Sequence, residues 1–352
     1  MMTVVRALLV SFVLSGAGIG VLFLTGKGFS LSDFSRFLTI QPLYVLYLLL
    51  ALVGWWVLSG WRLMILAQSK EVTLLRATRA FLLSLFAASV TPSATGSTFG
   101  MAWYLSKYTT AERATAVAVF SVGLDLVYFA WSLPVSILVL HLRGIDIGVG
   151  TPVLVLTTLF ALGLAWVLMF RADLLRHFVA ERRQGRPKQH ATLGDAAGLE
   201  PLERFRSGAQ GFVEETVRSV ALIRALPIPT QVLLHVITGL MYLTHFLTAN
   251  ALAAGIGLPI DHVALVATQS IVIAVGFLVP TPGGAGYYEI ALGRAFAATN
   301  VPESAIGPFV IMWRVISYYL YLLIGPFIGG AALIRAQQKQ KPDLETRDQV
   351  QS

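Results

Sequence analysis

The chain has 352 residues, of which 56% are hydrophobic and only 12% are charged. A soluble domain carries roughly 25% charged residues, so this composition predicts an integral membrane protein. The absence of cysteine excludes disulfides, thiolate metal sites and cysteine nucleophiles. The net charge of +8 is better explained by basic residues on the cytoplasmic side of a membrane than by binding to nucleic acid.

Six apolar runs approach the ~20 residues that cross a bilayer. The first run continues through Leu24 without a small-residue cleavage pattern, so we interpret it as a retained span rather than a signal peptide. The six predicted spans are Val5–Leu24, Pro42–Leu66, Ala114–Leu140, Val149–Phe170, Pro229–Gly255 and Ala305–Ile334.

Two further apolar regions are each broken near their middle. The first consists of Ala80–Val90 and Gly96–Leu105, with Pro92 between the two arms. The second consists of Val263–Val279 and Gly286–Ala298. The break in the second contains two prolines, which remove backbone donors, and three glycines, which permit left-handed backbone. Because hydrocarbon cannot satisfy freed backbone groups, such a break marks either a kink buried in protein or the lining of a cavity.

The basic residues predict how these segments are oriented. The segment 171–226 holds ten Lys/Arg against seven Asp/Glu, which predicts a cytoplasmic loop. Arg79 and Lys107 place both ends of the first broken region on the same inner side, so residues 80–105 are expected to form a re-entrant hairpin. By parity, residues 263–298 form a second hairpin that enters from outside. The alternative is eight simple crossings with two kinked helices, which would put basic residues on the wrong side.

The sequence therefore predicts an all-α polytopic membrane protein with about six full spans plus two re-entrant helical hairpins. The order of segments in residues 1–145 repeats with opposite orientation in residues 146–335, and residues 336–352 form a cytoplasmic tail. Both termini are expected in the cytoplasm. Paired short segments broken by Pro and Gly in matching halves indicate a transport site near the midplane of the membrane.

Charged side chains inside spans are costly and often functional. Asp125 follows Pro92 by 33 residues and Arg314 follows Pro282 by 32, so the repeat gives the acid and the base equivalent positions. We expect Asp125 and Arg314 to approach each other or to share a water-filled cavity. The alternative is a purely stabilising ion pair. The predicted spans and hairpins hold few such charges: Asp125, Glu289, Arg294 and Arg314, with Arg62 near the inner edge.

The second break leads into a predicted helix, so its free N–H groups and the positive end of the helix dipole should attract anions, including phosphate. Glu289 in the first turn of that helix would bind a cation or proton, or cap the helix and pair with Arg294. Tyr318 and Tyr321 lie four and seven residues after Arg314, on the same helical face. Their hydroxyls would bind a polar headgroup, or they are ordinary interfacial aromatics.

At these residues the chain resembles a known family. Thr91–Gly96, Pro280–Glu289, Trp61-Arg62 and Trp313-Arg314 are similar to motifs of flippase-like membrane proteins related to the transmembrane part of lysylphosphatidylglycerol synthase, also called the UPF0104 group. The resemblance implies movement of a phospholipid or glycolipid between the leaflets of a bacterial inner membrane. After the first motif the family often has a Glu and then an Arg, where this chain has Ser97–Met101. The full synthase also has a soluble aminoacyl-transfer domain with no counterpart in these residues, so the resemblance does not lead us to expect synthase activity.

We therefore predict a lipid flippase that uses no cofactor, metal or catalytic residue, with an anionic or glycolipid headgroup as its partner. The alternative is a membrane-embedded enzyme that acts on lipids or polyprenyl-phosphate sugars, with Asp125 or Glu289 as general base. A scaffold for partner enzymes would leave the embedded charges unexplained, and a homodimer is left open. The predicted substrate-binding residues are Pro92, Gly96, Asp125, Pro280, Pro282, Gly283, Gly284, Gly286, Glu289, Arg314 and Tyr318.

Overall fold

The computed structural model describes residues 39–145 except Pro92, residues 226–297 and residues 301–330, with a few isolated positions before residue 39. Apart from residue 226 and those isolated positions, the predicted spans Val5–Leu24 and Val149–Phe170, the loop 171–226 and the tail 336–352 lie outside the described residues. The described part is helical and contains no strand. Its α-helices are α3 (Pro42–Ala67), α4 (Leu74–Ser89), α5 (Gly96–Leu105), α6 (Ala111–Leu142), α10 (Ile228–Gly255), α11 (His262–Gly276), α12 (Tyr287–Ala297) and α13 (Glu303–Arg314).

Four helical segments in the described part are long and apolar enough to cross a membrane. They are α3, α6, α10 and the segment Ser304–Gly330, which combines α13 with a π-turn and a final helical stretch. They contain 26 to 32 residues each, more than the ~20 that span a bilayer. Helices of spanning length therefore lie where these spans were predicted, to within a few residues, and the helix at Ala305–Ile334 agrees as far as the described residues extend.

The four short helices occupy the two broken regions. α5 has the predicted bounds, and α11 and α12 begin and end within three residues of theirs. α4 begins at Leu74, six residues earlier than expected, because the Thr73 hydroxyl caps it by accepting from the backbone N–H of Arg76 at 3.5 Å. At 16 residues, α4 is roughly 24 Å long, and the other three are shorter. Each of the four is shorter than the ~30 Å hydrocarbon core.

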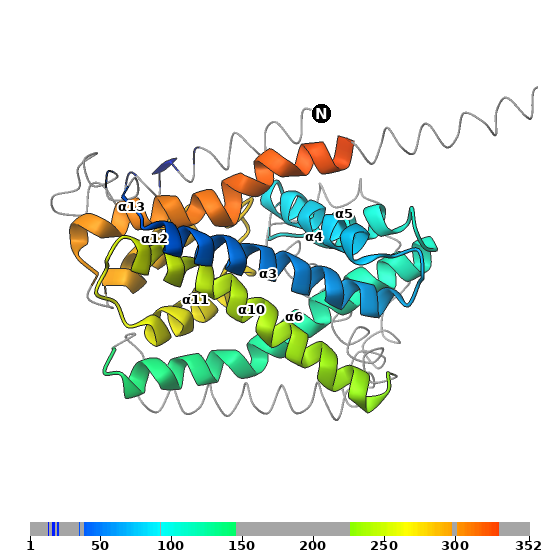
Figure 1. Ribbon diagram of the computed structural model, residues 1–352, viewed down its shortest axis with the longest axis horizontal. Helices are drawn as coiled ribbons and strands as arrows, with labels where there is room; N and C mark the ends of the chain where they lie inside the picture. Colours follow the sequence, from blue (N-terminus) through cyan, green and yellow to red (C-terminus); the bar gives the residue numbers. More distant parts are fainter. Residues whose placement is uncertain are drawn as a thin grey trace, which may run out of the picture.

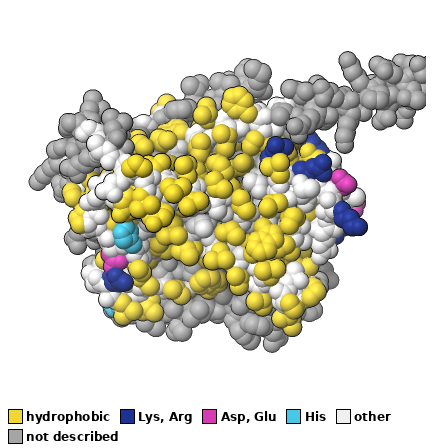
Figure 2. Space-filling view, viewed as in Figure 1, with side chains coloured by type: hydrophobic (Ala, Val, Ile, Leu, Met, Phe, Trp, Pro, Cys, Tyr) yellow, Lys and Arg dark blue, Asp and Glu magenta, His cyan; other side chains and the backbone are white. Residues whose placement is uncertain are grey.

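The surface of the described part is that of a membrane protein (Figure 2). Large apolar side chains are exposed along α3, such as Leu46 and Leu50, and along α10, such as Val232 and Val236. Charged side chains gather at the two ends of this apolar face (Figure 2). Continuous exposed apolar surface on this scale is costly in water and favourable in lipid.

The charged ends join loops that are distant in the sequence. At one end, the Arg76 guanidinium lies 4.4 Å from the centre of the Tyr108 ring, which links the start of α4 to the loop after α5. At the other, Arg143 after α6 forms an ion pair with Asp261 before α11. The N–H groups of Ala264 and Val263 and the charge of Arg143 together hold the pKa of Asp261 below its ordinary value.

The helices pack around α3 and α10, which lie side by side at the centre of the molecule (Figure 1). α3 also packs against α4, and the two backbones come close together at Gly60. A Cβ on Gly60 would lie 2.1 Å from the Thr78 hydroxyl and 2.8 Å from the Thr78 backbone nitrogen. Only glycine lets the two backbones come this close.

We expect Gly60→Ala to lower the free energy of unfolding by about 1–3 kcal/mol, because the clash with Thr78 involves backbone that cannot rotate away. Thermal unfolding of the purified protein in detergent measures this. Gly239→Ala in α10 is the matched control, since no atom of the described residues lies within 4 Å of its added Cβ. The control should be neutral or stabilising, as alanine favours a helix over glycine. Equal melting temperatures for Gly60→Ala and Gly239→Ala would contradict this interpretation.

Candidate functional site at the two helix breaks

The second break reverses the chain between α11 and α12 with three glycines in left-handed backbone. Their φ angles are +58° at Gly283, +63° at Gly284 and +84° at Gly286, a region that other residues rarely adopt. Beside them, Pro282 is buried and Pro280 is exposed. The Thr281 hydroxyl fastens the turn by donating to the carbonyl of Ala285 at 2.9 Å. The prediction that these glycines permit left-handed backbone is therefore confirmed.

The first break reverses the chain between α4 and α5 by a different device. The Thr91 hydroxyl donates to the carbonyl of Ala87 at 2.8 Å and accepts from the N–H of Gly96 at 2.8 Å. A Cβ on Gly96 would lie 2.7 Å from both of these oxygens, so a side chain there would disrupt the turn. Ser93 and Ala94 have positive φ angles of 49° and 54°. Pro92, which was predicted as part of the site, lies outside the described residues.

The two breaks touch each other although they lie almost 190 residues apart. The Ser93 hydroxyl donates to the carbonyl of Val279 at 3.3 Å. The Tyr318 hydroxyl donates to the carbonyl of Ser89, at the end of α4, also at 3.3 Å. The Tyr318 ring covers Gly283, where an added Cβ would lie 2.1 Å from a ring carbon. The two breaks and Tyr318 of the π-turn therefore form one site.

A buried ion pair lies at this site. Arg314 at the end of α13 donates from Nε to Glu289 Oε1 at 2.9 Å and from a terminal nitrogen to the carbonyl of Gly283 at 3.2 Å. The other carboxylate oxygen of Glu289 accepts from the N–H of Gly286 at 2.8 Å. The side chains are 2% and 0% exposed. Glu289 thus caps α12 as expected, but its partner is Arg314, and Arg294 is exposed.

Three of the N–H groups predicted to be free at the second break donate within the protein. The N–H of Gly284 donates to the carbonyl of Thr281, that of Ala285 to the carbonyl of Pro282, and that of Gly286 to Glu289. These three donors are therefore not open to an anion. Attraction for an anion also comes from the Arg314 guanidinium and from the dipole of α12.

Two aromatic rings flank Arg314. Its guanidinium carbon lies 4.3 Å from the centre of the Tyr318 ring and 5.5 Å from that of Tyr288. The predicted approach of Tyr318 to Arg314 is therefore confirmed. Tyr321 faces α3 instead, where its hydroxyl accepts from the Trp56 indole at 3.2 Å. The π-turn Val315–Tyr319 explains the difference, because its extra residue rotates everything that follows.

A second buried cluster surrounds Asp125 in α6. Its carboxylate accepts from Arg62 of α3 at 2.6 Å. Arg62 also donates to Ser121 at 2.7 Å and to Thr238 of α10 at 3.2 Å, and only 2% of its side chain is exposed, against 22% for Asp125. Arg62 Nε is buried, and no hydrogen-bond acceptor for it lies among the described residues.

We expected Asp125 and Arg314 to approach each other, but they do not form an ion pair with each other. Asp125 pairs with Arg62, within the first half of the chain, and Arg314 pairs with Glu289, within the second. Sequence reasoning also missed Ser121, Thr238 and Tyr288 as neighbours of these charges. Ser121 was detectable in principle, because it lies four residues before Asp125 on the same helical face. Within the described ranges, no three His, Cys, Asp or Glu side chains gather as metal ligands.

The apolar surface, the long helices and the buried charges define an integral membrane protein built from α-helices. The chain belongs to the family described as the lysylphosphatidylglycerol synthase TM region, whose model matches residues 5–325. It is also similar to a UPF0104 membrane protein of Archaeoglobus fulgidus, at 23% identity over 298 residues, which cover 81% of this chain and 85% of the relative. The resemblance found in the sequence motifs is thereby confirmed at the level of the family.

Proposed function

We propose that the protein moves a lipid with a phosphate-bearing or sugar-bearing headgroup between the leaflets of a bacterial cytoplasmic membrane. The observation that carries this proposal is the fully buried Arg314–Glu289 pair at the point where two broken helices meet. Charged side chains at membrane depth are costly and commonly mark the path of a polar substrate. Family membership agrees with a lipid-related role.

The contacts between the two halves support the inverted repeat on which this proposal depends. α6, the last helix of residues 1–145, packs against α11 of the other half. Conversely, Gly325 near the end of the second half packs against Phe86 of α4. α3 and α10, which occupy equivalent places in the two halves, lie side by side between these contacts (Figure 1). Each half thus covers the other half's hairpin, as a two-fold axis in the membrane plane requires.

The short helices support re-entrant hairpins. α4 and α5 pack together, and the Arg76–Tyr108 contact brings the outer ends of this pair to the same edge of the molecule. Lys70, Arg79 and Arg113 belong to the same loops and helix starts, so this edge would face the cytoplasm under the positive-inside rule. The pair α11 and α12 would then enter from the opposite side.

In the proposed mechanism, a headgroup phosphate takes the place of the Glu289 carboxylate. Both groups are anionic oxygen acceptors, and Glu289 at present occupies Arg314 with one oxygen and the N–H of Gly286 with the other. The contacts of Ser93 with Val279 and of Tyr318 with Ser89 close the space between the breaks, so they must separate for a headgroup to pass. The acyl chains would stay in the bilayer, and the lipid would leave chemically unchanged.

We expect Arg314→Ala to slow lipid movement by about tenfold or more, because losing a charge-assisted hydrogen bond costs about 1.5–3 kcal/mol. The measurement uses protein reconstituted in vesicles with a fluorescent phospholipid and an impermeant quencher. Arg294→Ala is the matched control, since this exposed arginine lies on the same hairpin and should leave the rate unchanged. The double variant Glu289→Gln/Arg314→Gln leaves no unpaired buried charge and should also be slow.

A folded Arg314→Ala protein that moves lipid at the wild-type rate would remove Arg314 from the mechanism. Mass spectrometry of the vesicle lipids after the assay tests the second part of the proposal. A transporter leaves every lipid mass unchanged, whereas an enzyme acting on lipids produces a new mass in proportion to the amount of protein.

A further inference from the structure

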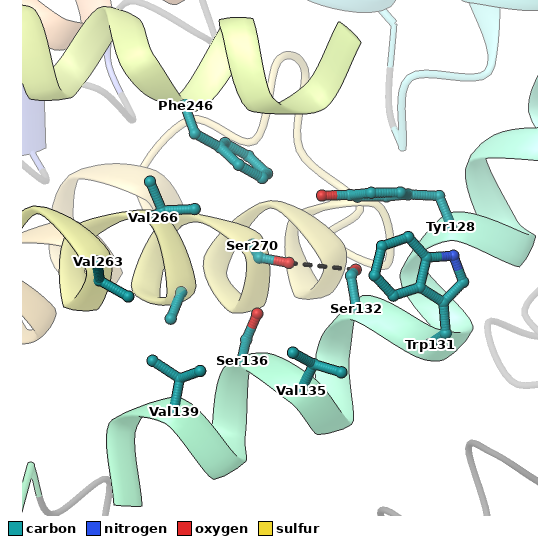
Figure 3. A pocket seen from close by; sticks show the side chains of 11 residues that line it. Tyr128, Trp131, Ser132, Val135, Ser136, Val139, Phe246, Val263, Val266 and Ser270 are labelled. Carbon is teal, nitrogen blue, oxygen red and sulfur yellow. Dashed lines mark hydrogen bonds between the residues drawn. The ribbon is translucent and has the colours of Figure 1, made fainter. Parts of the chain in front are cut away.

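A hollow of about 160 Å³ lies between α6 and α11, on the half of these helices that leads to the Arg143–Asp261 end (Figure 3). Tyr128, Val139 and Ser132 line it from α6, Val266 lines it from α11 and Phe246 closes it from α10. Among the described residues that line it, none is a Lys, Arg, Asp or Glu. The hollow is therefore a poor place for a charged group.

The hollow opens toward the surface that lipid would cover. Three of its lining side chains are half exposed, at 40% for Trp131, 49% for Val135 and 49% for Val263. The Ser270 hydroxyl donates to the Ser132 hydroxyl at 3.3 Å, and Ser136 points toward the same space (Figure 3). An apolar hollow of this kind in a bilayer loses packing energy unless a hydrocarbon chain fills it.

The equivalent contact on the other side of the molecule is closed. There the final helical stretch packs on α4, and a Cβ added to Gly325 would lie 2.3 Å from the Phe86 ring. Gly329 lies against Leu83 in the same contact, with 3.5 Å from its added Cβ to a Leu83 methyl. The two contacts that the inverted repeat makes equivalent therefore differ. The contact between the final helical stretch and α4 is filled by Phe86 packed on Gly325, whereas the contact between α6 and α11 is hollow.

We propose that the hollow between α6 and α11 binds one acyl chain of a membrane lipid, and that lipid reaches the helix breaks from this side. The second part rests on the proposed function. Ser270 lies six residues before Gly276, the last residue of α11, which corresponds to roughly 9 Å along the helix. The second break follows directly, so one lipid can place its chain in the hollow and its headgroup near Arg314.

A phosphatidylglycerol with a photoreactive group in its acyl chain tests this in vesicles containing the full chain. After illumination, digestion and mass spectrometry, label should concentrate several-fold on residues 131–139 and 263–270 relative to the exposed face of α3 around Leu46 and Leu50. Ser136→Phe fills the hollow and should remove this excess. Val53→Phe on the exposed face of α3 is the matched control and should not. Ala267→Leu narrows the same hollow and replaces Ser136→Phe if that variant does not fold.

Equal labelling of the hollow and of the α3 face, unchanged by Ser136→Phe, would overturn the proposal. Loss of the excess label together with slower lipid movement supports both of its parts. If the excess label is lost but lipid moves at the wild-type rate, lipid does not reach the helix breaks from the side of the hollow, and the second part of the proposal is refuted. If the wild-type protein shows excess label on the hollow but moves no lipid, the binding site is supported and the proposed function is refuted.

Discussion

Replacing Glu289 with alanine should lower the free energy of unfolding by about 3–5 kcal/mol, because the variant leaves the Arg314 guanidinium buried without its counter-charge. The carboxylate is fully buried, and each of its oxygens has its own partner, Arg314 Nε and the N–H of Gly286. The change therefore removes an ion pair and the cap of α12 together. Denaturant titration of the purified protein in mixed micelles measures the loss.

Two further variants separate the buried charge from other consequences of the substitution. Glu289→Leu/Arg314→Met removes both charges at similar volume and should recover most of the stability, since an apolar replacement of a buried pair is often neutral. Arg294→Ala, on the exposed side of α12, should be within about 0.5 kcal/mol of wild type. A double variant as unstable as Glu289→Ala would show that packing, rather than the unpaired charge, dominates at this site.

Gly283→Ala should destabilise the protein by about 2–5 kcal/mol, through two effects at one residue. Left-handed backbone costs about 1–2 kcal/mol for a residue with a Cβ, and overpacking costs about 1–3 kcal/mol more. Gly283 has a φ of +58°, and its added Cβ would lie 2.1 Å from the Tyr318 ring. Because this ring also covers Arg314, displacing it should slow lipid movement as well.

Gly257→Ala isolates the backbone effect of that change. Gly257 has a φ of +70° with nothing within 4 Å of an added Cβ, so its variant should lose only about 1–2 kcal/mol. The double variant Gly283→Ala/Tyr318→Ala relieves the clash. Compared with Tyr318→Ala alone, it should lose only the same backbone cost in free energy of unfolding. If Gly283→Ala and Gly257→Ala unfold at the same denaturant concentration, Tyr318 does not pack on Gly283 as described.

The sequence predicted the ends of helices well where proline or glycine marks them. Pro42 begins α3, Gly96 begins α5, and the Pro/Gly cluster follows the end of α11, so the observed bounds lie close to these residues. A helix start that depends on a single capping hydroxyl was not predicted. α4 begins at Leu74 because the Thr73 hydroxyl caps it, and apolar runs alone placed its start six residues too late.

The pairing of the charges could not be predicted, because sequence gives depth along each helix but not the tilt between helices. Asp125 lies 14 residues into α6 and Arg62 lies five residues before the end of α3, roughly 21 Å and 8 Å from those helix ends. They nevertheless meet, because the two helices cross. Likewise, the π-turn after Arg314 rotates Tyr321 toward Trp56 and away from the predicted face.

The central claim is that the two helix breaks form the passage for a lipid headgroup and must separate during transport. The chain has no cysteine, so Ser93→Cys/Val279→Cys places a single cross-link between the breaks. Ser69→Cys/Tyr108→Cys joins two loops through a similar hydroxyl–carbonyl contact of 3.4 Å and serves as the control. The measurement is the rate of phospholipid movement in vesicles before cross-linking, after it, and after reduction.

We predict that the cross-link between the breaks stops lipid movement, that reduction restores it, and that the control cross-link changes it little. Lipid movement at the same rate before and after complete cross-linking of Cys at positions 93 and 279 would contradict the account.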